Sequence, residues 1–113
     1  MDKLIIYQKA RNLLKKIYLI TEQNGSLRRD YALKDQIRRS AISVVLNISE
    51  GYGRGTKHFK SYLKISVGSV NEVIATLSII EDIYLIDLKE LRNEYLILAK
   101  QISAFSNSFP KLV

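Results

Sequence analysis

The chain has 113 residues, no cysteine and a net charge of +7 at pH 7. This length suits one domain with a single core, and a hydrophobic share of 47% is ordinary for a globular protein and excludes a disordered chain. The lack of cysteine excludes disulfide scaffolds and thiol chemistry. No signal peptide and no uninterrupted membrane-spanning run are recognisable, so we expect a single soluble, cytoplasmic domain over residues 1–113.

The positive charge is concentrated in the first half of the chain. Residues 1–64 contain 14 Lys or Arg and 5 Asp or Glu, whereas residues 65–113 contain 4 and 6. An uneven distribution of this kind indicates a contact surface for an anionic partner. The alternative is that these side chains only keep helix surfaces soluble.

The first predicted helix runs from about Lys3 to Gln23. Its apolar residues recur at spacings of three and four and so share one helix face; they are Ile6, Ala10, Leu13, Ile17 and Ile20. Asn24 and Gly25 supply the left-handed residue that commonly ends a helix. Residues 26–30 are then expected to form a short polar loop.

The second predicted helix starts near Tyr31 and ends close to Glu50, before the glycines. It directs one apolar series inward, namely Leu33, Ile37, Ala41, Val44 and Ile48. Its second half adds Ile42, Val45 and Leu46 on another side, so that part needs cover from two directions. Either a larger internal core or a neighbouring subunit could provide this cover, and with three other helices available we favour a subunit interface at these three residues.

A glycine-rich segment follows, with Gly51, Gly53 and Gly55 flanking Tyr52 and Arg54. It is expected to stop the helix and form a turn. Glycine clusters can cradle phosphate through backbone N–H groups, but this one lacks the preceding strand and the Lys-Ser/Thr pair of a P-loop. A plain helix connection is therefore the favoured interpretation.

The third predicted helix is the longest, with Thr56 as its N-cap and its end near Tyr84. Its inner face carries Phe59, Leu63, Val67, Val70, Ile74 and Leu77, and its opposite face carries Lys57, Lys60 and Lys64. Gly68 interrupts the helix beside Ser66 and Ser69, which predicts a close crossing with another backbone at Gly68.

The last predicted helix begins near Asp87 and Glu90, which have capping-box spacing. Its apolar repeat consists of Leu88, Leu91, Tyr95, Leu98, Ile102, Phe105 and Phe109 and stops at Pro110. Four amphipathic helices with short connections predict an all-α fold, specifically an antiparallel up-down-up-down four-helix bundle.

Residues suited to catalysis or metal binding are sparse. His58 is the single histidine, so no His pair or Cys/His cluster can form, and it is expected on the surface. Glu50 and Glu72 come without a nucleophile or a metal-ligand partner. We therefore expect no enzymatic activity, no catalytic residues, no metal and no cofactor, with an active site at the two glutamates as the minor alternative.

Several motifs together resemble a known family. They are Arg38-Arg39-Ser40-Ala41, then Asn47-Ile48-Ser49-Glu50-Gly51-Tyr52-Gly53-Arg54, then Phe59 and Leu63, and then Gly68-Ser69 with Glu72. In this order and spacing they resemble the four-helix proteins encoded in 23S ribosomal RNA intervening sequences, and the similarity extends over nearly the whole chain. Departures from the family pattern are Val45 in place of proline, Ser49 in place of alanine and His58 in place of an acid. Without the proline, the second helix is expected to be straighter.

The resemblance implies a small bacterial bundle that assembles as a ring of five subunits and binds nucleic acid through a basic surface. A structurally similar group serves as accessory proteins beside the reverse transcriptases of diversity-generating retroelements. The motif residues Asn47, Glu50, Gly51, Gly68, Ser69 and Glu72 are interpreted as structural, with buried carboxylates partnered by nearby arginines.

The expected function is thus a non-enzymatic, ring-forming protein that binds nucleic acid, with RNA favoured. The residues assigned to this contact are Arg38, Arg39, Tyr52, Arg54, Lys57, Lys60 and Lys64. The alternative is a scaffold that binds a protein partner, such as a retroelement reverse transcriptase, and uses its charge for solubility.

Overall fold

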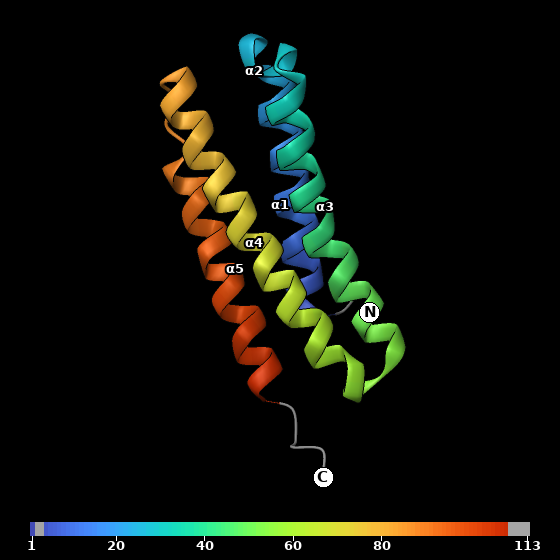
Figure 1. Ribbon diagram of the computed structural model, residues 1–113. Helices are drawn as coiled ribbons and strands as arrows, with labels where there is room; N and C mark the ends of the chain where they lie inside the picture. The colour runs from blue at the N-terminus through green and yellow to red at the C-terminus, as the bar shows by residue number, and fades with distance from the viewer. Residues whose placement is uncertain (2–3, 109–113) are drawn as a thin grey trace.

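The computed structural model describes Met1 and residues 4–108, apart from the side chain of residue 56. Within these residues it contains five helices and no strand: α1 (Ile5–Gln23), α2 (Gly25–Arg29), α3 (Tyr31–Arg54), α4 (Thr56–Tyr84) and α5 (Lys89–Asn107). The four long helices run antiparallel along a body of 51 × 22 × 20 Å (Figure 1). The predicted all-α bundle is confirmed. The predicted helix start at Lys3 and the end at Phe109 and Pro110 lie outside the described residues.

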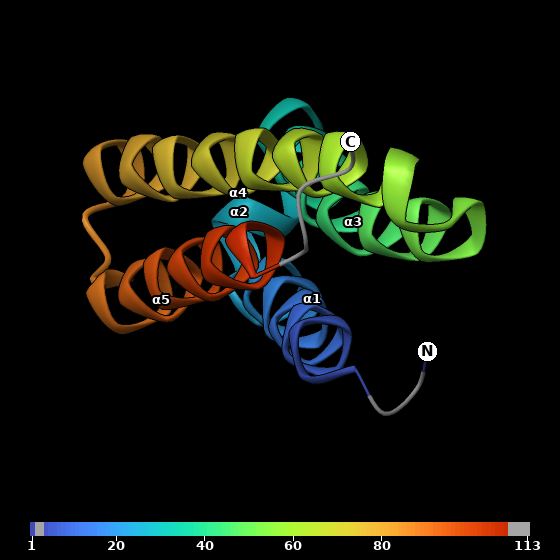
Figure 2. The same ribbon diagram turned by 90° about the horizontal axis from the view of Figure 1, so that it is seen from below.

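Each long helix packs against two others. α3 contacts α1 and α4, and α5 contacts α4 and α1, so α1 and α4 occupy opposite corners of the bundle (Figure 2). The predicted inner faces supply the centre of the core, whose fully buried side chains include Ile17, Ile37, Ile48, Leu63, Val70, Leu77, Tyr95 and Ile102. Burial of these faces is the main source of the stability of the fold.

The connection between α1 and α3 differs from the expected polar loop. Residues 25–29 form the short helix α2, because the side chain of Asn24 accepts a hydrogen bond from the Leu27 backbone N–H at 2.9 Å. Leu27 itself is fully buried. Asn24 and Gly25 adopt no left-handed conformation here, since the described residues with positive φ are Gly55 and Leu85. Through the buried Leu27 side chain, the α1–α3 connection contributes to the hydrophobic core.

The α3–α4 turn also differs from the prediction. Gly51 and Gly53 lie inside α3, which continues without a break to Arg54, and the turn is made by Gly55 with φ of 83°. Gly55 also occupies the N-cap position of α4, which the sequence had assigned to Thr56. A positive φ is readily adopted only by glycine, so one of the three glycines makes the turn and the other two serve different purposes.

The end of the bundle that carries the α2–α3 and α4–α5 connections is held by two carboxylates. Asp30 caps α3 by accepting from the Leu33 N–H at 3.1 Å, and it accepts from the Tyr84 hydroxyl at 2.6 Å. The Tyr84 hydrogen bond is the main reason why the pKa of Asp30 is lowered and that of Tyr84 is raised. Glu81 accepts from the Leu88 N–H at 3.0 Å and pairs with Arg92; the Leu88 hydrogen bond is the largest cause of its lowered pKa.

Among the described residues, one helix is long and apolar enough to cross a membrane, the segment Lys57–Tyr84 of α4. In this structure its inward face is a core face of a compact bundle, with Leu63, Val70 and Leu77 fully buried. Only 44% of its most apolar stretch is buried inside the chain. Part of the apolar character of α4 therefore lies on the molecular surface.

Candidate nucleic-acid interface

The α3–α4 hairpin is joined by a seam of small polar side chains. Ser43 and Ser69 share a hydrogen bond between their Oγ atoms at 2.8 Å, and the buried Ser66 Oγ donates to the Val44 carbonyl at 2.8 Å. Asn47 donates from Nδ2 to the Ser43 carbonyl at 2.8 Å and to its Oγ at 3.0 Å. Small hydroxyl side chains let the two backbones approach each other while their polar atoms stay paired.

Gly51 marks a close approach of α3 to α4 within this seam. A Cβ at this position would lie 2.7 Å from the Tyr62 Cβ, 2.8 Å from the Phe59 Cδ1 and 3.2 Å from the Phe59 Cα. Gly68, for which the close crossing was predicted, is exposed on the outer side of α4 and would place its Cβ in open space. The predicted crossing at Gly68 is wrong, because the seam runs along the other side of α4.

The two motif glutamates are not buried, contrary to the expectation of buried carboxylates. The Glu50 side chain is half exposed and pairs with Arg54 at 2.7 Å, one turn along α3. Glu72 is exposed and accepts a hydrogen bond from the Ser40 Oγ at 3.2 Å. Both acids border the seam from the solvent side. Both carboxylates are therefore solvated by water as well as bonded to these partners, so neither is a buried charge.

The predicted lysine face lies at the start of α4, on its flank toward α5. Lys57, Lys60 and Lys64 are all exposed on the first three turns of α4 and span about 10 Å along its axis at 1.5 Å per residue. We call these three residues the lysine stripe. Lys60 and Lys64 also line a groove of about 330 Å³ between α4 and α5, together with polar Ser103, Ser106 and Asn107. Ammonium and hydroxyl groups beside one another are suited to phosphate oxygens.

Arg54 and Tyr52 lie at the end of α3 and contact the start of α4. The Arg54 guanidinium lies 5.6 Å from the Tyr62 ring centroid, and its hydrogen bond to Glu50 is the main cause of its raised pKa. Tyr52 is exposed and packs edge-on against Phe59, with ring centroids 5.8 Å apart. An exposed aromatic ring anchored in this way can stack on a base.

Arg38 does not belong to this surface. Its Nε donates to the Thr21 Oγ1 at 3.0 Å, its Nη2 pairs with Glu22 at 2.9 Å, and its guanidinium lies 4.1 Å from the Tyr18 ring centroid. Only 19% of its side chain is exposed, so Arg38 ties α3 to α1 and leaves little charge for a ligand. Arg39 is exposed in the first half of α3, about four turns before the end of α3 that leads into the lysine stripe on α4.

The three residues assigned to a subunit interface separate in the structure. Leu46 is 59% exposed, Ile42 is partly buried and Val45 is 7% exposed. Val45 belongs to the core of its own chain, which corrects its assignment to the interface. The exposed apolar surface of α3 is therefore narrower than the sequence indicated, since it includes Leu46 and part of Ile42 but not Val45.

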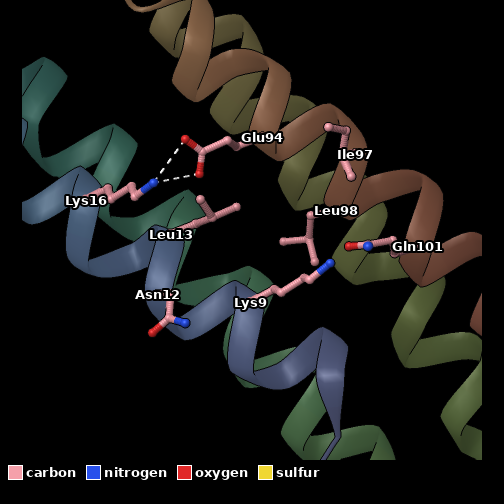
Figure 3. A pocket seen from close by; sticks show the side chains of 8 residues that line it. All are labelled: Lys9, Asn12, Leu13, Lys16, Glu94, Ile97, Leu98 and Gln101. Atoms are coloured by element: carbon pink, nitrogen blue, oxygen red, sulfur yellow. Dashed lines mark hydrogen bonds and ion pairs between the residues drawn. The ribbon is translucent and has the colours of Figure 1, made fainter.

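A second groove, of about 480 Å³, lies between α1 and α5 and was not predicted (Figure 3). Leu13 and Leu98 line it beside the ion pair between Lys16 and Glu94 at 2.7 Å. Gln101 lies along the same groove, and its Oε1 is buried without a hydrogen-bond partner among the described residues. The helical periodicity of α1 and α5 could predict which faces meet but not how closely they pack.

The described residues contain no group of three or more His, Cys, Asp or Glu side chains placed to hold a metal ion. His58 is exposed next to the lysine stripe. The protein is thus an antiparallel four-helix bundle with a basic surface at the α3–α4 hairpin.

Residues 2–108 match the family described as 23S rRNA-intervening sequence protein, and the chain belongs to this family. The fold is similar to the crystal structure of a protein with unknown function from the S23 ribosomal protein family of Bacteroides thetaiotaomicron, with a TM-score of 0.81 and 18% sequence identity over 91% of this chain and 99% of that chain. No curated protein matches the sequence. The resemblance inferred from the motifs is therefore confirmed, while the likeness in structure concerns the fold alone.

Proposed function

We propose that this protein is a non-enzymatic nucleic-acid-binding protein of the cytoplasm that favours RNA and acts as a ring of subunits, with five as the favoured number. The observation that carries the proposal is the lysine stripe, Lys57, Lys60 and Lys64, exposed on one side of a helix whose other side is fixed in the core. Membership of a family defined by a ribosomal RNA intervening sequence supports RNA as the ligand.

The stripe suits a polyanion better than a small anion. Three ammonium groups along about 10 Å of helix can each contact a different phosphate, and every contact releases counterions from the nucleic acid. Phosphate contacts carry no sequence information, so we expect weak discrimination between sequences. A preference for RNA would come from shape and from stacking on Tyr52. Repetition of the stripe around a ring would add the weak contacts into useful avidity.

Charge reversal tests the proposal. The variant carrying Lys57→Glu, Lys60→Glu and Lys64→Glu should lose binding to a 23S ribosomal RNA hairpin in a filter assay at low salt, while its helical circular dichroism and its sedimentation stay unchanged. The matched control changes Arg28, Lys89 and Lys100 to Glu, which are exposed elsewhere on the molecule. Arg92 is unsuitable as a control because it pairs with Glu81.

The control variant should bind RNA with at most a modest loss, since it has the same net charge as the stripe variant but an intact stripe. Equal losses in both triple variants, or no RNA binding by the unaltered protein, would contradict the proposal. The basic face would then be ordinary solvated surface, and a scaffold for a protein partner, such as a retroelement reverse transcriptase, would take its place.

A further inference from the structure

Two apolar faces of the bundle remain exposed to solvent. The first, which we call the α4 outer face, consists of Ile65, Gly68, Ala75, Ile79 and Ile83, which recur at helical spacing on the side of α4 that points away from the core. Its three isoleucines are 46–56% exposed. The small residues at positions 68 and 75 leave room for side chains of another molecule to approach the helix, since a Cβ at Gly68 would meet nothing within 4 Å.

The second face, which we call the α1–α3 face, consists of Leu14, Tyr18, Leu19, Ile42 and Leu46. A shallow groove of about 740 Å³ opens between the two helices here, lined by Leu14, Lys15, Tyr18, Leu19, Glu22 and Ile42. Leu46 follows Ile42 by one helical turn and is 59% exposed. α1 and α4, which carry the two faces, lie at opposite corners of the bundle (Figure 2). α3 contributes Ile42 and Leu46 to the α1–α3 face.

The two faces carry opposite charge. The α4 outer face is bordered by exposed Glu72 and Asp82, and residues 65–83 contain no Lys or Arg. Glu81, in the same stretch, is paired with Arg92 of α5 and does not contribute. The α1–α3 face is bordered by exposed Lys15 and Arg39 and by one exposed acid, Asp35, a turn before Arg39 on α3. Its lining acid, Glu22, is paired with Arg38. The border therefore keeps a net positive charge. Contact between two α4 outer faces would bring like charges together at Glu72, and contact between two α1–α3 faces would do the same at Lys15 and Arg39. The mixed pairing places the acids of α4, Glu72 and Asp82, against the bases Lys15 and Arg39 and gives the best charge complementarity.

We infer that the α4 outer face of one copy of this chain docks on the α1–α3 face of the next copy. The inference rests on the proposed ring and names the surfaces that would form it. Because the two surfaces differ, the contact is head to tail, and a contact of this kind generates a closed ring when its rotation closes. Isoleucines of α4 would enter the α1–α3 groove, with Glu72 and Asp82 facing Lys15 and Arg39. The lysine stripe lies on the flank of α4 toward α5 and stays accessible.

A pair of single variants distinguishes this arrangement from others. Ile79→Asp disables the α4 outer face, and Leu46→Asp disables the α1–α3 face; both side chains are exposed in the single chain, so the helical fold should persist. Each variant alone should sediment as a monomer. Mixed in equal amounts they should form a dimer of one copy each, because each still has the face that the other needs. Leu96→Asp, an exposed position on α5, is the matched control and should assemble like the unaltered protein.

Three results would overturn the inference. Self-association of Leu46→Asp alone would indicate pairing between α4 outer faces, normal assembly of Ile79→Asp would remove α4 from the interface, and failure of the mixture to dimerise would exclude the head-to-tail contact. RNA binding is measured separately on the same samples. If the protein assembles as inferred but does not bind RNA, only the proposed function is contradicted. If it binds RNA and its assembly is unchanged by Ile79→Asp and by Leu46→Asp, only this inference is contradicted.

Discussion

The seam between α3 and α4 and the seam between α1 and α5 hold the same bundle together in different ways. At the first, serines form hydrogen bonds across the contact, and Gly51 lets the two helices approach closely. At the second, the helices stand apart over a groove of about 480 Å³ and are joined at its rim by the Lys16 and Glu94 ion pair. Several family motif residues, among them Asn47, Gly51 and Ser69, lie at the first seam, on the helix that carries the lysine stripe or on its neighbour α3. A rigid seam there keeps the proposed binding surface in place.

Gly51→Ala should have the largest effect on stability. Its Cβ would collide with the Tyr62 Cβ and the Phe59 ring and crowd the Phe59 Cα, so we expect a loss of about 1–3 kcal/mol in the free energy of unfolding. The matched control is Gly53→Ala in the same helix, where a Cβ meets nothing within 4 Å and the change should be neutral or stabilising by up to about 1 kcal/mol. Urea melts at matched protein concentration measure both. Equal effects of the two substitutions would show that no close approach exists at Gly51.

Ser66→Ala should have a smaller effect, a loss of about 1 kcal/mol, because it removes the buried hydrogen bond to the Val44 carbonyl. Ser61→Ala, at an exposed position on the same helix, should change the urea midpoint very little. If Ser66→Ala is as mild as Ser61→Ala, the hydroxyl contributes nothing to the α3–α4 seam.

Acid should weaken the end of the bundle near α2. The folded-state pKa values of Asp30 and Glu81 are lowered, so the unfolded chain takes up protons first as the pH falls. Their contribution to stability is fully present above the ordinary carboxylate pKa of about 4 and is lost as the pH drops through the folded values. Glu81→Gln should therefore lower the melting temperature at pH 7 and flatten its fall between about pH 5 and pH 2. An unchanged slope would mean that Glu81 makes no such contribution.

Lys16→Ala should have the smallest effect of the series. The Lys16 and Glu94 side chains are 50% and 31% exposed, and ion pairs of this kind contribute about 0.2–1 kcal/mol at most. Lys9→Ala, a lysine on the same helix and the same groove, is the control. A destabilisation by Lys16→Ala as large as that by Gly51→Ala would show that the α1–α5 seam is not the weaker one.

Much of the fold could be predicted from the sequence, because apolar spacing determines which helix faces are buried. The inner faces around Ile37, Leu63 and Tyr95 follow the three-and-four repeat and lie in the core as expected. Helix ends were harder, since Gly51, Gly53 and Gly55 look equally suited to a turn. The difference lies in what surrounds them: Phe59 and Tyr62 crowd Gly51, and only Gly55 has a positive φ. One-dimensional spacing contains no such information.

The candidate site was predictable only in part. The lysine stripe follows from helical periodicity alone, because Lys57, Lys60 and Lys64 recur within one face. The position of Arg38 could not be predicted in this way. Its guanidinium is held by Thr21 and Glu22, which lie 17 and 16 residues earlier on another helix. Gly68 was misplaced for a related reason: a glycine indicates that some surface needs to be free of a side chain, but not whether that surface faces α3 or another molecule.

The salt dependence of RNA binding tests the central claim most directly. The logarithm of the binding constant for a 23S ribosomal RNA hairpin, plotted against the logarithm of salt concentration, should fall steeply for the unaltered protein. Replacing Lys64 with Gln should reduce the slope by about 0.7–0.9 for each phosphate that this side chain neutralises, whereas Lys100→Gln on α5 should leave it unchanged. Equal slopes for all three proteins would contradict the claim that the lysine stripe binds the nucleic acid.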